Sequence, residues 1–237
     1  MLKAIVFDFD GVIADSEPLH FASFRDVLAE EGVALTETEY YTLYLGFDDV
    51  GALTSIGALQ PEPWTATRVA HLAERKAERF EALQRDVPVL FPGAASAIRR
   101  AAAEVPIAIA SGALHAEIQR VLDRASLTSC FAAIVAADDT PLSKPAPDPY
   151  LYAIAQLSTA TGEPISPSSC VAIEDSYWGL ESARSAGLRT VAVAQTYPHK
   201  ELPLADLVIP TIAALDLSIL RMLVSDSAQP DRINPRG

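Results

Sequence analysis

The chain has 237 residues, half of them apolar and about a fifth charged, which is enough apolar material for a sizeable core. The formal net charge of −13 argues against nucleic-acid and anionic-membrane partners, because both attract basic surfaces. Neither Cys130 nor Cys170 belongs to a CxxC pair, so the sequence predicts neither a disulfide framework nor a zinc site.

The first predicted element is a short buried strand over residues 2–7, followed directly by two carboxylates, Asp8 and Asp10. Gly11 then permits a sharp turn of the backbone. Ligands of open parallel sheets bind outside the carboxyl ends of the strands, so this pair of acids is a candidate for an active-site crevice. The alternative is an Asp-Gly loop that only caps the strand.

Residues 16–85 have a different character and are predicted to form an all-helical cap inserted after the first strand. Four helices are expected in this segment. The first has an apolar face over Leu19–Leu28, and the second runs from the capping box of Thr36 and Glu39 to Gly46. The third is capped by Asp48, and the fourth covers Thr65–Arg85. Inserted at this point of the chain, the cap is expected to act as a lid that excludes water from the carboxyl ends of the sheet.

From Phe91 onwards, short apolar runs alternate with helical stretches, which is typical of βαβ units and a parallel sheet. The expected strands are Ile107–Ala110, Ala133–Ala136, Val171–Ile173, Thr190–Val193 and Leu207–Ile209. The expected helices cover residues 93–103, 114–125, 149–159 and 177–186. The sequence therefore predicts a Rossmann-like α/β core formed by residues 1–15 and 86–237, in which residues 226–237 form a flexible tail.

Polar residues also occur where later strands of this core end. Ser111 and Gly112 precede a helix, where a hydroxyl and backbone N–H groups can hold phosphate or simply cap the helix. Lys144 lies in a proline-rich loop, which suits a rigidly positioned charge as well as a solvated one. Glu174 and Asp175 offer the hard oxygen ligands that Mg²⁺ prefers, or can cap the next helix.

Taken in order, these residues resemble the haloacid dehalogenase-like phosphohydrolase superfamily, with Asp-x-Asp-Gly first, then Ser, then Lys-Pro, then Glu-Asp. The segments Asp8–Pro18, Phe91–Gly93 and Lys144–Pro149 look like the branch that contains β-phosphoglucomutase and sugar-phosphate phosphatases. The resemblance covers essentially the whole chain, and it implies a Rossmann-like core with a helical cap.

The resemblance also implies a role for each of these residues. Asp8 is the expected nucleophile that forms an aspartyl phosphate, and Asp10 the expected general acid and base. Ser111, Gly112 and Lys144 are the implied contacts for phosphate. The implied ligands of Mg²⁺ are the Asp8 carboxylate, the backbone carbonyl of Asp10 and Asp175. Glu174 is implied either as a further ligand or in the shell around the ligands. Independently of the family, acids and a phosphate dianion repel one another unless a dication and a lysine intervene.

Hydrolysis is preferred over phosphoryl transfer between two positions of a sugar. In β-phosphoglucomutase, a basic residue of the cap is expected to hold the second phosphate of a bisphosphate, whereas here the turn Leu45–Val50 carries Asp48 and Asp49. His20, Arg75 and Lys76 are the cations that could compensate. The candidate substrate contacts in the cap are His20, Gly46, Phe47 and Asp48, and Asp48 is equally suited to be a helix N-cap.

Dehalogenation and a phospho-receiver role fit the sequence less well. Dehalogenases of the superfamily need neither Mg²⁺ nor the second aspartate, and phospho-receiver domains lack the Asp10 acid and the inserted cap. We expect a small phosphorylated metabolite as the substrate, no nucleic-acid or membrane partner, and a monomer or weak homo-oligomer. A cytoplasmic location is expected, because the first residues do not form a secretory signal and no apolar run approaches the roughly 18 residues that cross a bilayer.

Overall fold

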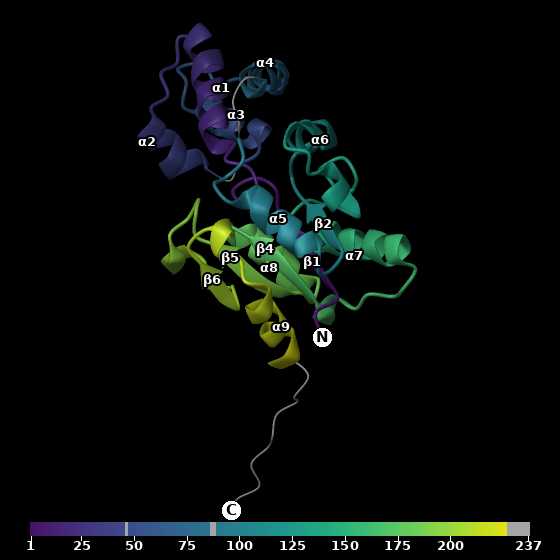
Figure 1. Cartoon of the computed structure of the whole chain (residues 1–237). Helices are drawn as coiled ribbons and strands as arrows, with labels where there is room; N and C mark the ends of the chain where they lie inside the picture. Colours follow the sequence, from purple (N-terminus) through teal and green to yellow (C-terminus); the bar gives the residue numbers. More distant parts are fainter. Residues whose placement is uncertain (46, 86–88, 227–237) are drawn as a thin grey trace, which may run out of the picture. The chain divides into compact units, whose positions relative to one another are not determined.

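The computed structural model describes residues 1–45, 47–85 and 89–226. The chain divides into two compact units (Figure 1): a core unit, Met1–Asp15 with Leu90–Gly237, and a helical cap unit, Ser16–Val89. The second junction thus falls slightly later than the sequence-based boundary after Arg85.

The core unit contains a six-stranded sheet in the order β3-β2-β1-β4-β5-β6, and every neighbouring pair is parallel. The strands are β1 (Ala4–Phe7), β2 (Ile107–Ala110), β3 (Ala133–Val135), β4 (Cys170–Glu174), β5 (Arg189–Val193) and β6 (Leu207–Ile209). Every residue of β1, β2 and β4 is buried, and apart from Glu174 at the end of β4 these strands are uninterrupted apolar runs, as expected for strands covered on both faces. The predicted α/β fold class is confirmed.

Helices lie on the sheet in the order that the βαβ pattern predicts. The core helices are α5 (Ala94–Ala102), α6 (His115–Arg124), α7 (Asp148–Thr161), α8 (Tyr177–Ser185) and α9 (Leu217–Asp226). Helix α7 packs on β1, β2 and β3, and α8 packs on β4 and β5. Helix α9 was not predicted, and the prediction that the tail begins at residue 226 was wrong for Asp226, which belongs to α9. Residues 227–237 lie outside the described residues.

The cap unit is built from helices, two of which have the side-chain caps that the sequence predicted, at Thr36 and at Asp48. Its elements are α1 (Glu17–Glu30), α2 (Glu37–Glu39) with a π-helical turn (Tyr40–Tyr44), α3 (Asp49–Ala58) and α4 (Ala66–Gln84). Thr36 and Glu39 form the capping box, Asp48 accepts a hydrogen bond from the Gly51 N–H at 2.6 Å, and Thr65 caps α4. Apolar side chains of α1, α3 and α4 fill the interior of the unit. Gly46, the predicted end of the second helix, lies outside the described residues.

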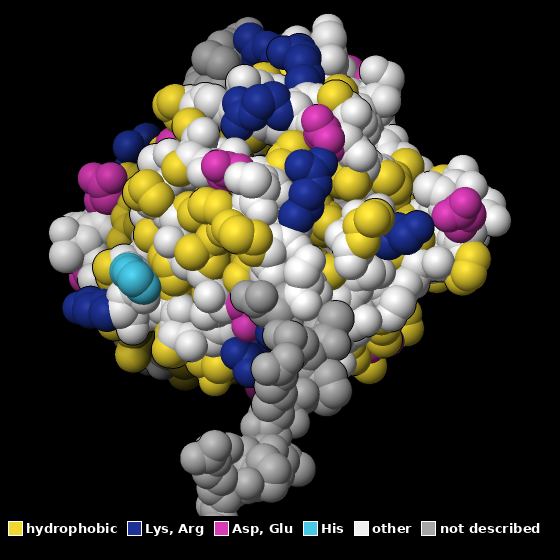
Figure 2. All heavy atoms as spheres, turned by 60° about the horizontal axis from the view of Figure 1, so that its bottom comes forward, with side chains coloured by type: hydrophobic (Ala, Val, Ile, Leu, Met, Phe, Trp, Pro, Cys, Tyr) yellow, Lys and Arg dark blue, Asp and Glu magenta, His cyan; other side chains and the backbone are white. Residues whose placement is uncertain are grey.

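The surface carries charges of both signs. On the face shown in Figure 2, Lys and Arg side chains stand singly or in small groups among acidic and apolar ones. Among the helices described, none is both long enough and apolar enough to cross a membrane.

Candidate active site

The candidate site lies where the strand order of the core sheet reverses. Strands β1 and β4 are neighbours in the middle of the sheet. The next strand along the chain after β1 is β2, on one side of this pair, and the next strand after β4 is β5, on the other side. Asp8 follows β1 and donates its backbone N–H to the Ile173 carbonyl of β4 at 2.8 Å. Asp175 follows β4 by one residue, so both acids emerge at the same edge. This topological switch point is where open α/β sheets bind ligands.

Three carboxylates meet at this edge. Asp8, Glu174 and Asp175 are all buried, and each offers a carboxylate oxygen within 4.8 Å of the oxygens of the other two. The donor set consists only of hard oxygen atoms, which suits Mg²⁺ better than a soft transition metal. The expected contribution of Asp10 to such an ion is its backbone carbonyl, and its side chain is not part of this group.

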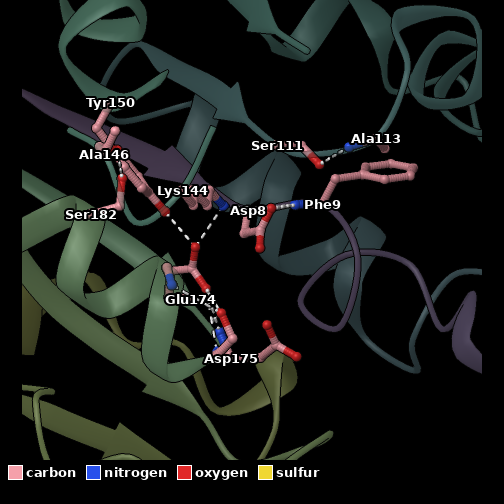
Figure 3. Close-up of polar contacts among 12 residues, drawn as sticks. Asp8, Phe9, Ser111, Ala113, Lys144, Ala146, Tyr150, Glu174, Asp175 and Ser182 are labelled. Atoms are coloured by element: carbon pink, nitrogen blue, oxygen red, sulfur yellow. Dashed lines mark hydrogen bonds and ion pairs between the residues drawn. The ribbon is translucent and has the colours of Figure 1, made fainter. Parts of the chain in front are cut away.

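Lys144 provides positive charge directly between two of these carboxylates. Its Nζ atom lies 2.9 Å from Oδ1 of Asp8 and 2.6 Å from Oε1 of Glu174 (Figure 3). The lysine comes from the loop between β3 and α7, and its peptide bond to Pro145 is cis. The sequence placed Lys144 in a stiff loop, and the structure brings its ammonium group against the predicted nucleophile.

Glu174 is the most extensively bonded group of the site. Its Oε1 atom accepts hydrogen bonds from Lys144 and from the Tyr150 hydroxyl, the latter at 2.8 Å. Its Oε2 atom accepts the backbone N–H groups of Asp175 and Ser176 and the Ser176 hydroxyl. Both oxygens therefore serve to organise neighbouring groups of the protein.

Negative charge at the site exceeds the charge of the single lysine. Burial, and then the neighbouring Glu174, raise the pKa of Asp8 from its ordinary value to about 7. Burial, and then the neighbouring Glu174 and Asp8, raise the pKa of Asp175 well above its ordinary value. Burial opposes the charge of Lys144, but Asp8 and Glu174 outweigh it and raise the lysine pKa. Two carboxyl groups with raised pKa values beside a cation are the signature of a site that is short of positive charge, so the residues fit a divalent ion.

Gly11 brings the backbone close to this cluster. It adopts a φ of +73°, and a Cβ atom at this position would overlap the carboxylate of Asp175 and lie 2.7 Å from Oγ1 of Thr196. Gln195 donates to the Gly11 carbonyl at 3.1 Å. Gln195 and Thr196 were not predicted as site residues, although they lie two and three residues after the predicted strand Thr190–Val193. Polar residues after a parallel strand are expected to lie at the ligand-binding edge of the sheet, and this rule would have identified both residues.

Ser111 follows β2 and precedes helix α6, as the sequence predicted, but it does not belong to the helix itself. It is buried at the end of β2, and its hydroxyl accepts the Ala113 N–H at 3.0 Å. Helix α6 begins only at His115. Ser111 and Gly112 thus precede the helix, as expected, and a short loop separates them from its first turn. The N–H groups available to a phosphate here belong to that loop.

Asp10 occupies the turn that follows Asp8. It is half-buried and forms a bridge with Ala14, and the Gly11 N–H donates to the Ala14 carbonyl at 2.9 Å. Asp8 is buried whereas Asp10 is only half-buried, which leaves the two aspartates in different surroundings. Two acids whose environments differ are what a nucleophile and a proton donor require.

Within the cap unit, the predicted substrate contacts have unequal surroundings. Nδ1 of His20 and Oδ1 of Asp49 each lie 2.6 Å from Nζ of Lys76, whose side chain is almost fully buried. Burial, and then Lys76, lower the pKa of His20 well below its ordinary value, which leaves it neutral. Phe47 is 54% exposed, and Asp48 is the N-cap of α3.

Comparison with known proteins gives a consistent result. A family model for haloacid dehalogenase-like hydrolases matches residues 2–187. Hexitol phosphatase B of Escherichia coli (strain K12) is 30% identical over 195 residues, which cover 81% of this chain and 83% of that protein. β-Phosphoglucomutase of Bacillus subtilis (strain 168) is 29% identical over 225 residues, 92% of this chain and 94% of that protein. The crystal structure of CbbY from Rhodobacter sphaeroides in complex with phosphate has a TM-score of 0.79 and 29% identity, and the match covers 93% of this chain and 100% of that one.

Proposed function

This chain belongs to the haloacid dehalogenase-like hydrolase family, and from that membership we propose that it is a Mg²⁺-dependent phosphatase that hydrolyses a small phosphate monoester. The observation that carries the proposal is the position of Lys144 between Asp8 and Glu174, beside the carboxylate of Asp175. This arrangement supplies a nucleophile, a fixed cation and oxygen ligands for a metal ion at one strand edge.

Asp8 is the proposed nucleophile. One of its carboxylate oxygens attacks phosphorus, the bond from phosphorus to the leaving-group oxygen breaks, and an aspartyl phosphate forms. Lys144 lies against Asp8 and offsets the charge of the transferring phosphoryl group. Asp8, Asp175 and the Asp10 carbonyl, with Glu174 beside them, would hold Mg²⁺, which would supply positive charge to offset that of the phosphoryl oxygens. Ser111 and the loop around Gly112 are the proposed contacts for those oxygens.

Asp10 is the proposed general acid and base. It donates a proton to the leaving oxygen as the first bond breaks, and the carboxylate that results accepts a proton from the attacking water. Water then hydrolyses the aspartyl phosphate, inorganic phosphate leaves and Asp8 is regenerated. The different burial of the two aspartates supports this division of roles, because Asp8 is buried and Asp10 is only half-buried.

The proposed substrate is a sugar or polyol monophosphate. The support comes from relatives that are named hexitol phosphatase and β-phosphoglucomutase, and from CbbY with bound phosphate. His20 and Phe47 remain the proposed contacts for the leaving group. Asp48 is already used as a helix cap, and so we no longer assign it a contact with substrate.

The ion pair inside the cap unit favours hydrolysis over mutase activity. Lys76 was one of the cations that could have compensated for the acids of the Leu45–Val50 turn. Its ammonium group is instead buried, paired with Asp49 and enclosed by the rings of Phe24 and Phe80. To contact a second phosphate, Lys76 would have to leave this buried position and give up its ion pair with Asp49. A bisphosphate intermediate therefore gains little from Lys76.

A phosphate-release assay tests the proposal. Hexose and hexitol monophosphates, phosphoglycolate and nucleotides are supplied with Mg²⁺, while conversion of glucose 1-phosphate to glucose 6-phosphate is followed in parallel. We expect steady phosphate release from one or a few sugar or polyol esters, loss of activity in excess chelator, and no turnover by Asp8→Asn. Isomer conversion without release would establish a mutase. A stable phosphoaspartate without turnover would establish a receiver-like module.

A further inference from the structure

The loop that carries Lys144 is fastened to the core by two residues outside the carboxylate cluster. Ser182 of α8 is fully buried, and its hydroxyl donates a 2.5 Å hydrogen bond to the Ala146 carbonyl, two residues after the lysine. The Ala146 N–H donates in turn to the Ser143 carbonyl at 3.0 Å. The backbone on both sides of Lys144 is therefore closed into a turn and tied to α8.

Tyr150 fixes the other end of the same side chain. It lies in the first turn of α7 and is 0% exposed, and its ring centroid is 5.2 Å from the Lys144 ammonium nitrogen. Its hydroxyl donates to Oε1 of Glu174, the same oxygen that accepts from Lys144. Burial, and then Glu174, raise the pKa of this hydroxyl, so it stays a donor. Figure 3 shows the Tyr150 hydroxyl and the Lys144 ammonium group converging on this oxygen of Glu174.

We propose that Tyr150 and Ser182 are positioning residues that hold the ammonium group of Lys144 against Asp8 and Glu174. The inference rests on the proposed function, in which Lys144 contacts the transferring phosphoryl group. A lysine has a flexible four-carbon stem and binds as a point charge, so its effect on a transition state depends on where its stem and partners are held. Carboxylates alone would hold it less well, because Asp8 itself becomes phosphorylated and ceases to be a full anionic partner.

Two conservative substitutions test the role of each residue. Tyr150→Phe keeps the ring and removes only the hydroxyl, and Ser182→Ala removes only the hydroxyl that holds Ala146. We expect both variants to fold, with kcat reduced about tenfold and KM changed less than about twofold, because the lost positioning matters most in the transition state. The matched controls are Tyr152→Phe on α7, whose side chain is exposed, and Ser185→Ala on α8, also exposed; both should keep wild-type kcat.

A double-mutant cycle shows whether the effect passes through Lys144. In a Lys144→Ala background, measured in single-turnover experiments, adding Tyr150→Phe or Ser182→Ala should cause no further loss. A further loss equal to that in the wild-type background would overturn the proposal, because the residues would then act on something else. Wild-type kcat in both single variants would overturn it as well.

Crystal structures of the two variants keep the test independent of the proposed function. We expect the Lys144 ammonium group to leave hydrogen-bonding distance of Asp8 or Glu174 in at least one of them. If wild-type protein releases no phosphate from any ester, the proposed function fails, but a displaced lysine would still support the positioning role. An unmoved lysine in both variants would refute it whatever the activity.

Discussion

Gly11 is the residue at which the backbone comes closest to the proposed metal ligands. A Cβ atom there would overlap the Asp175 carboxylate, and the φ of +73° adds backbone strain. We expect Gly11→Ala to displace Asp175 and to raise the Mg²⁺ concentration needed for half-maximal activity about tenfold or more, the consequence of losing one oriented ligand. A Mg²⁺ titration of activity, with thermal unfolding in parallel, measures both effects.

Gly162 provides the control for this prediction. It has a similar φ of +71° at the end of α7, but a Cβ atom there would meet no other atom within 4 Å. Gly162→Ala should therefore lower stability by about 1 kcal/mol, the cost of a strained φ, and leave the Mg²⁺ dependence unchanged. Equal Mg²⁺ dependence in both variants would mean that the overlap at Gly11 does not reach the metal site.

At the residue scale, the sequence located the candidate site because of a simple geometric rule. Asp8, Lys144, Glu174 and Asp175 all follow predicted parallel strands, and the carboxyl ends of such strands share one edge. Sequence reasoning could not assign Tyr150, because a buried aromatic residue in an amphipathic helix is usually part of the core. Only its hydroxyl distance to Glu174 distinguishes it, and that distance depends on how α7 packs.

At the scale of secondary-structure elements, capping decides the role of Asp48. Its side chain accepts the Gly51 N–H, which satisfies one of the free donors in the first turn of α3. We expect Asp48→Ala to lower the free energy of unfolding by about 1 kcal/mol and Asp48→Asn to lower it much less, because asparagine is also a good cap. Denaturant unfolding measures this difference.

Activity measurements on the same two variants separate the cap role from a substrate contact. If Asp48 acts only as a cap, kcat/KM should stay within about twofold of wild type in both proteins at a temperature where they are folded. A large fall in kcat/KM for Asp48→Asn, with stability retained, would restore the substrate contact that the sequence had left open.

The type and order of most elements were predictable, whereas some boundaries and one helix were not. Strands such as β2 were predicted residue for residue, because uninterrupted apolar runs between helical stretches are typical of buried parallel strands. The π-helical turn after α2 was missed, since its sequence also suits an ordinary α-helix. Helix α9 was missed, because it lies close to the polar C-terminal segment that dominated the prediction.

For the whole molecule, acidic residues outnumber Lys and Arg by 31 to 18. Among the residues that the structure describes, the buried acids gather at the candidate site. Folding brings these carboxylates together, which opposes folding unless they are protonated or a cation joins them. The stability of the chain is therefore expected to depend on pH and on Mg²⁺ through the same group of residues. Composition alone gives the net charge but not this coupling, which needs the fold to bring β1 and β4 side by side.

The sign of the pH dependence follows from the pKa of Asp8. Between its ordinary value of 3.8 and about 7, the folded chain holds a proton on Asp8 that the unfolded chain has lost. Unfolding then releases a proton, so the contribution of Asp8 to stability decreases as the pH rises from 5 to 8. The lowered pKa of Glu174 and the raised pKa of Lys144 give contributions that are constant in this range. The lowered pKa of His20 gives an opposite slope below its ordinary value of 6.5.

Comparison with Asp8→Asn removes this titration and leaves His20 unchanged, because Asp8 is not among the groups that shift the pKa of His20. The Asp8 charge also helps to raise the pKa of Asp175, so the difference between the two proteins reports Asp8 together with its effect on Asp175. Without metal, we expect the unfolding free energy of wild type minus that of Asp8→Asn to fall by about 3 kcal/mol between pH 5 and 8, measured by denaturant unfolding. Saturating Mg²⁺ should stabilise wild type more at pH 8 than at pH 5, because the ion competes with protons for the carboxylates. A difference that rises with pH, or Mg²⁺ stabilisation that is equal at both pH values, would contradict a metal site built on Asp8.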